Sequence, residues 1–280
     1  MKLPPLDLDA LHKAALHATN RQLAQYLLDT LGPTLPRLHT RHAHIHALVA
    51  QAGNLVCHEG YSSTREYSVL VLTHFLLGLG WWNDLACQPL WPGTQAGGLA
   101  QDERLGLLAE QAIAHRQQLE TQLPHMHDII LAMSGWREDA KDDDRLWHSI
   151  TQLMALRGLP SDTHEDCYCQ YESDACERYG LRPLQHKELN GNEILAYRHY
   201  GKRLPQPSDD LKHLPALPRN QVLLHVLLAI AFGRHFYLNP LFATWVTSLD
   251  EQGSARQRWQ VLGKQLAAHQ RALKDTPSHV

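Results

Sequence analysis

The sequence contains no uninterrupted apolar run of about 20 residues, the length that a helix needs to cross a bilayer. Its two longest apolar stretches, residues 68–82 and 221–237, are interrupted by His, Thr or Gly. Both are therefore expected to form buried helices of a globular protein, and no membrane insertion is predicted. The first 20 residues also lack the apolar segment and cleavage pattern of a secretory signal.

Several chemical motifs are missing as well. The chain has no Gly-rich phosphate-binding loop, no dinucleotide-binding fingerprint and no nucleophile elbow. Its net charge is only −3, so nothing draws it as a whole to nucleic acid or to a membrane surface. Its 5 cysteines are an odd number, which suits a reducing compartment better than a disulfide framework. The sequence therefore predicts a cytoplasmic protein that does not bind nucleic acid.

No segment alternates apolar and polar residues in the manner of a strand, whereas stripes with helical spacing recur along the chain. The fold class predicted is all-α, a multi-helix globular bundle. Pro124 is expected to break one helix, and residues 161–180 are the least helix-like segment. Helices are predicted over residues 6–31, 35–56, 63–78, 99–123, 126–133, 142–156, 184–200 and 254–274, and from residue 220 onward.

The two apolar stretches coincide when the chain is shifted by 155 residues. Gly78 then falls on Gly233, and the pair Trp81–Trp82 falls on Phe236–Tyr237. Only 3 of the 14 positions from 69 to 82 are identical, so a chance likeness of apolar helices stays open beside a true repeat. If the repeat is real, two related helical halves surround two buried apolar helices. The predicted regions are an N-terminal helical half (1–157), an acidic, Cys-containing segment with a Pro-rich connection (158–219), and C-terminal helices on the same core (220–280).

Charge is unevenly distributed along the chain. Residues 138–177 hold 11 acidic against 3 basic side chains, whereas residues 178–280 hold 14 basic against 7 acidic ones. Such an acidic middle is typical of a solvated loop, or of a face that docks a basic partner. The candidate partner-binding residues are Glu165, Asp166, Glu172, Asp174 and Glu177.

The same segment holds four potential zinc ligands within 13 residues, namely His164, Cys167, Cys169 and Cys176. Their Cys-x-Cys spacing is less typical of zinc than Cys-x-x-Cys, and no second ligand pair follows. The surrounding acids are expected to raise the thiol pKa values rather than to activate the thiols. Free thiols in a polar loop are thus the alternative to a zinc-stabilised loop.

Two further histidine groups could bind metal. His39, His42 and His46 share one face of a predicted helix, but no Glu follows His42 as a helical zinc protease requires. The pair His127–Asp128 is similar to the metal-binding dipeptide of helical phosphohydrolases of the HD type, although Ile residues follow it where that family has small ones. A metal-dependent hydrolase is therefore the alternative function.

Two stretches resemble uncharacterised helical proteins of bacterial type VI secretion and toxin–immunity loci. They are GYSSTREYSVLVLTHFLLGLGWWNDLACQPLWP, from Gly60, and LLAIAFGRHFYLNPLFATWV, from Leu227. The resemblance implies a cytoplasmic protein that occludes a partner protein, such as a toxin or a secretion component, and catalyses nothing. It carries no site residues over to this chain.

Overall fold

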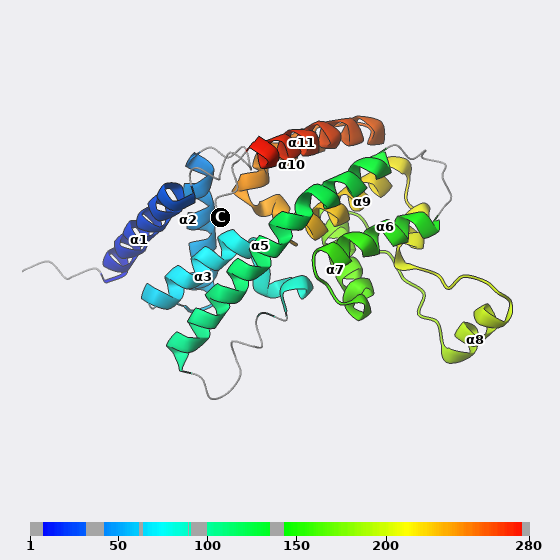
Figure 1. Cartoon of the computed structure of the whole chain (residues 1–280), viewed down its shortest axis with the longest axis horizontal. Coiled ribbons are helices and arrows are strands. Elements are labelled where there is room, and N and C mark those ends of the chain that lie inside the picture. The colour runs from blue at the N-terminus through cyan, green and yellow to red at the C-terminus, as the bar shows by residue number, and fades with distance from the viewer. Residues whose placement is uncertain are drawn as a thin grey trace, which may run out of the picture. The chain divides into compact units, whose positions relative to one another are not determined.

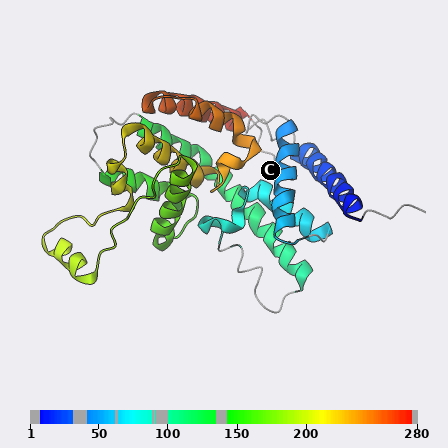
Figure 2. The ribbon, with the colours of Figure 1, turned by 180° about the vertical axis from the view of Figure 1, so that it is seen from behind.

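The computed structural model describes residues 8–31, 42–61, 64–88, 90, 100–134 and 143–275. Regular structure within these ranges is helical and includes no strand, which confirms the all-α prediction (Figures 1 and 2). None of the helices in these ranges is long and apolar enough to cross a membrane. The chain divides into two compact units, described separately below. Unit 1 comprises residues 1–117, 235–247 and 267–280, and unit 2 comprises residues 118–234 and 248–266.

Unit 1 is built on three helices that pack against one another, α1 (Leu8–Leu31), α2 (His42–His58) and α3 (Thr64–Leu77) (Figure 1). At their junction the Tyr67 hydroxyl of α3 donates a hydrogen bond to the Asn20 side-chain oxygen of α1, at 2.6 Å. The buried side of α2 follows helical spacing, which is why this segment folds as an amphipathic helix. Its buried apolar side chains are Ile45, Leu48, Val49, Ala52 and Val56.

Unit 2 is built around α9 (Ala216–Phe232), which packs against α6 (Asp143–Leu156) and α7 (His164–Arg178). Arg157, itself buried, donates through Nη1 to the carbonyl oxygens of Ala229 at 2.8 Å and Ile230 at 3.1 Å. These are carbonyls of the last turn of α9, where a cation also complements the helix dipole. Arg234 follows the same helix and binds both oxygens of Asp174 on α7, at 2.6 and 2.8 Å. Two arginines therefore fix the end of α9 to its neighbours.

Three helices contribute residues to both units, α5 (Gln101–Ser134), α10 (Ala243–Asp250) and α11 (Ala255–Asp275). The short 3₁₀ turns of unit 1 are η2 (Trp81–Asn83), η3 (Leu85–Cys87), η6 (Phe236–Leu238) and η7 (Pro240–Phe242), and those of unit 2 are η4 (Ser161–Thr163) and η5 (Pro207–His213). The predicted region 158–219 falls within unit 2, whereas 220–280 is divided between the units.

The two segments related by a shift of 155 residues are similar in backbone geometry as well as in sequence. Both apolar helices end before a glycine of nearly equal φ, 104° at Gly78 and 101° at Gly233. Each is followed by a 3₁₀ turn over the aromatic pair and then by a second 3₁₀ turn. An Asp84 oxygen accepts from the Ala86 amide at 3.0 Å, and an Asn239 oxygen accepts from the Leu241 amide at the same distance. This agreement of turns and caps supports a repeat over a chance likeness.

Several predicted boundaries were wrong. Residues 164–178, within the segment expected to be least helical, form α7, because its cysteines and tyrosines act as the apolar face of a helix. Pro124 lies inside the continuous α5 and does not break it. The Pro-rich connection contains η5, and α9 begins at Ala216 rather than at the predicted residue 220. Residue 63, where the helix α3 was predicted to begin, lies outside the described residues.

Candidate functional site

Between α7 and η5 the chain leaves the core of unit 2 as an arm, which we define as residues 181–206. Figures 1 and 2 both show the arm extending away from α6, α7 and α9. Its regular structure is one short helix, α8 (Gly191–His199). A capping box starts α8, since the Asn190 side chain accepts from the Glu193 amide and the Glu193 carboxylate accepts from the Asn190 amide, both at 3.0 Å. The helix predicted from residue 184 therefore begins only at 191.

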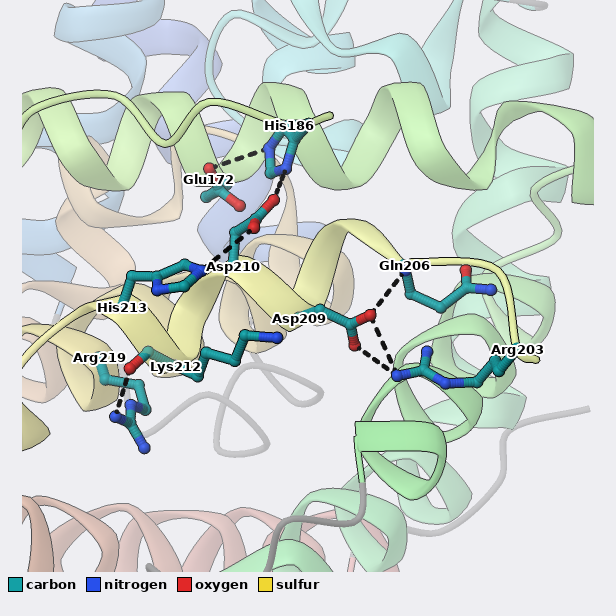
Figure 3. Close-up of polar contacts among 9 residues, drawn as sticks. All are labelled: Glu172, His186, Arg203, Gln206, Asp209, Asp210, Lys212, His213 and Arg219. Atoms are coloured by element: carbon teal, nitrogen blue, oxygen red, sulfur yellow. Dashed lines mark hydrogen bonds and ion pairs between the residues drawn. The ribbon is translucent and has the colours of Figure 1, made fainter. Parts of the chain in front are cut away.

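The part of the arm that precedes α8, which we call the ascending limb, is held by His186. Its Nε2 lies 3.2 Å from a carboxylate oxygen of Glu172 on α7, and its Nδ1 lies 2.9 Å from a carboxylate oxygen of Asp210 on η5 (Figure 3). Ionised carboxylates only accept hydrogen bonds. The arrangement therefore needs a proton on each ring nitrogen, or a proton on one of the two carboxylates.

The part of the arm that follows α8, which we call the descending limb, is held by Asp209, the residue before Asp210 on η5. Asp209 accepts from one guanidinium nitrogen of Arg203 at 2.9 and 3.0 Å and from the backbone amide of Gln206 at 2.9 Å (Figure 3). Adjacent carboxylates on η5 thus hold the two limbs of the arm, Asp210 the ascending one and Asp209 the descending one. We call the five residues Glu172, His186, Arg203, Asp209 and Asp210 the clamp.

The turn η5, which carries Asp209 and Asp210, is also held at its C-terminal end. Arg219 on α9 donates to the carbonyl oxygens of Lys212 and Leu214, both at 3.0 Å. His213 lies 3.8 Å from the second oxygen of Asp210, on the side away from His186 (Figure 3). An acidic start and a basic end both complement the helical dipole of η5. The clamp is therefore anchored to α7 and α9.

The deepest clamp residue is Glu172, whose side chain is buried. Burial raises its pKa, and the facing His186 and Tyr168 oppose that shift. Burial, and then the Glu172 carboxylate, raise the pKa of Tyr168 well above its ordinary value. Burial and nearby carboxylates likewise raise the pKa of Cys169 to about 11. The tyrosine and this thiol are consequently neutral at pH 7.

The structure divides the five predicted partner-binding acids into two sets. Glu172 and Asp174 are buried and paired within the chain, with His186 and Arg234 respectively. Glu165, Asp166 and Glu177 are exposed on α7. Only the second set can present carboxylates to another molecule.

The predicted zinc ligands are not gathered around a common point. All four lie on α7, where Cys167 and Cys176 are buried and Nε2 of His164 lies 3.1 Å from the Leu159 carbonyl. Across the described ranges, no three His, Cys, Asp or Glu side chains are placed to hold a metal ion. The predicted zinc loop is therefore not supported.

The other histidine groups have separate surroundings. His42 and His46 are exposed on α2, and His39 lies outside the described residues. His127 is buried in unit 2 with its ring 6.1 Å from that of Phe232, whereas the adjacent Asp128 is exposed. The side chains of this His–Asp dipeptide thus face different surroundings, one buried and one exposed.

Sequence reasoning missed the clamp. His186 and Arg203 are single residues with no motif, and they acquire partners only when the arm folds back on α7 and η5. One local signal existed, Pro207, since proline is common at the first position of a helical turn. No family model, curated protein or solved structure matches the chain.

Proposed function

We propose that this protein is a non-catalytic cytoplasmic interaction factor, of the immunity or accessory kind, that binds and occludes a basic partner protein. The observation that carries the proposal is a row of exposed carboxylates on one side of unit 2. Its members are Asp162, Glu165, Asp166 and Glu177. Their side chains have no ion-pair partner within the described ranges, and we call them the acidic row.

The acidic row stands on a rigid support. The opposite face of α7 is buried through Cys167, Tyr168, Tyr171 and Ala175. Charges held in place by a packed helix attract a complementary surface without first losing side-chain and backbone freedom. The row therefore suits docking better than the same charges on a loose loop would.

The test uses purified proteins encoded by the genes next to this one, which the resemblance to toxin–immunity loci singles out. Binding is measured by biolayer interferometry for the wild type and for a variant with Glu165→Gln, Asp166→Asn and Glu177→Gln. Rim charges chiefly govern the association rate, so we expect the variant to associate about 10-fold more slowly and the wild type to slow likewise at high salt.

The matched control removes three exposed acids elsewhere, through Glu59→Gln, Glu110→Gln and Glu251→Gln. This set changes the net charge by the same amount, so it separates the acidic row from a general charge effect. Equal association rates for the two triple variants would discard the acidic row as the docking surface. Absence of binding to every neighbouring product would reject the interaction factor itself.

A further inference from the structure

The helix α8 is only partly covered by the described residues. It has 9 residues and none of them is buried. Leu195 is 63% exposed, and Tyr200, at the C-cap, is 72% exposed. Isolated helices shorter than about 12–15 residues are marginal in water, so α8 stands to gain stability from any surface that covers it.

The open face of α8 can be identified from its spacing. Asn192, Leu195, Ala196 and His199 are all exposed and follow the i, i+3, i+4, i+7 positions of one helix face. The less exposed residues of the helix, Glu193, Ile194 and Tyr197, lie on the other side. The four positions of the open face lie symmetrically about the midpoint between Leu195 and Ala196.

We propose that α8 pairs antiparallel with α8 of a second copy of this chain, around a two-fold axis at that midpoint. A two-fold interface requires a patch that complements itself. Reversal about the midpoint places the large Leu195 opposite the small Ala196, and the Asn192 amide opposite the His199 imidazole. Every position of the open face therefore meets a suitable partner in the second copy.

The charges of the arm favour the same orientation. Glu188 precedes α8, whereas Arg198 and Lys202 lie at or beyond its C-terminal end, and all three are exposed without an ion-pair partner in the described ranges. Lys187, also before the helix, is already bonded to Glu193 at 2.8 Å. Antiparallel pairing brings Glu188 of one copy near Lys202 of the other and opposes the two helix dipoles.

The pairing is expected to be weak and dependent on concentration. About ten residues a side is fewer than the 20–30 of a stable interface, so we expect a dissociation constant of roughly 10–100 μM. The clamp reduces the cost of pairing, since both limbs of the arm are already held in place. The inference uses the arm alone and does not depend on the acidic row.

Sedimentation equilibrium tests the inference between about 5 and 500 μM, a range that brackets the expected constant. The average mass should rise from 31.8 kDa toward twice that value. Leu195→Asp places a charge at the axis and should weaken pairing at least about 10-fold. The control Leu11→Asp alters a side chain on α1 that is 53% exposed and should leave pairing unchanged.

A charge swap separates loss of pairing from loss of folding, because two variants that pair again when mixed must both be folded. Glu188→Lys alone and Lys202→Glu alone should each weaken pairing, because each homodimer then opposes like charges. An equimolar mixture of the two variants should pair again, since both contacts across the axis are once more between opposite charges. A mass of 31.8 kDa at every wild-type concentration, equal effects of the two Asp substitutions, or no recovery in the mixture would overturn the proposal.

Discussion

At the scale of single residues, two buried histidines tie stability to pH. His74 in unit 1 accepts a hydrogen bond at Nδ1 from the Gly80 amide, at 3.1 Å, so its ring is neutral. Burial lowers the pKa of His74 to about 4, and burial lowers the pKa of His127 in unit 2 to about 4 as well. The unfolded chain, with an ordinary histidine pKa near ~6.5, binds these protons first. Stability is therefore complete above that value and is lost as pH falls toward 4.

We expect the free energy of unfolding to be lower at pH 5 than at pH 7.5, by about 2 kcal/mol for each of these histidines. His74→Asn keeps an acceptor for the Gly80 amide, and His127→Leu keeps the apolar packing. Each variant should flatten the pH dependence by about that amount, as measured by urea unfolding at the two pH values. A pH dependence that stays as steep in both variants would show that other groups control it.

At the scale of elements, the clamp determines how firmly the arm is held. Removal of one partner from a buried polar pair leaves the other without compensation, which costs about 1–3 kcal/mol. His186→Ala does this to Glu172, whereas Glu172→Gln substitutes a neutral side chain of the same shape that can still bond the ring. The two variants therefore separate a loss of the contact from a loss of charge.

We expect His186→Ala to lower stability by about 1–3 kcal/mol and to speed trypsin cleavage within the arm, because the ascending limb is released. The arm offers trypsin Lys187, Arg198 and Lys202, none of which is followed by proline. Glu172→Gln should cost under about 1 kcal/mol and leave cleavage close to the wild-type rate. Cleavage rates are followed by mass spectrometry of the fragments, and equal rates for all three proteins would contradict the clamp.

At the scale of the whole molecule, two corners 155 residues apart share one turn geometry. Both copies of the corner turn after the apolar helices depend on a φ near 100°, which only glycine adopts readily. The corners also meet, since the His235 Nδ1 of the second lies 3.2 Å from the Leu79 carbonyl of the first, within unit 1. Equivalent positions should therefore respond alike to the same substitution.

Gly78→Ala and Gly233→Ala should each destabilise the protein by about 1–3 kcal/mol, because each forces a Cβ into a strained backbone conformation. Gly106→Ala on α5 is the control, since no atom lies within 4 Å of the added methyl group and alanine favours a helix. Thermal unfolding monitored by circular dichroism measures all three. A large loss at one glycine and none at the other would argue against equivalent corners.

Much of the fold follows from local pattern, and the exceptions share a cause. The buried helices α3 and α9 and the corner Gly78-x-x-Trp81-Trp82 were predictable because periodicity and turn residues act over a few positions. The segment around Cys167 and Tyr168 was misjudged, since cysteine and tyrosine serve equally as polar or core residues until a partner covers them. The clamp was not predictable, because its partners come from three separate elements.

By itself the sequence determined an all-α protein with two buried helices, since apolar spacing and helix-ending residues act within one segment and need no knowledge of the rest. Only the tertiary structure decided how the acids of α7 are used. Glu172 and Asp174 lie inward, where His186 and Arg234 compensate their burial, whereas Glu165, Asp166 and Glu177 remain in water. Local sequence cannot make that division, because the free energy of a carboxylate depends on what the fold places beside it.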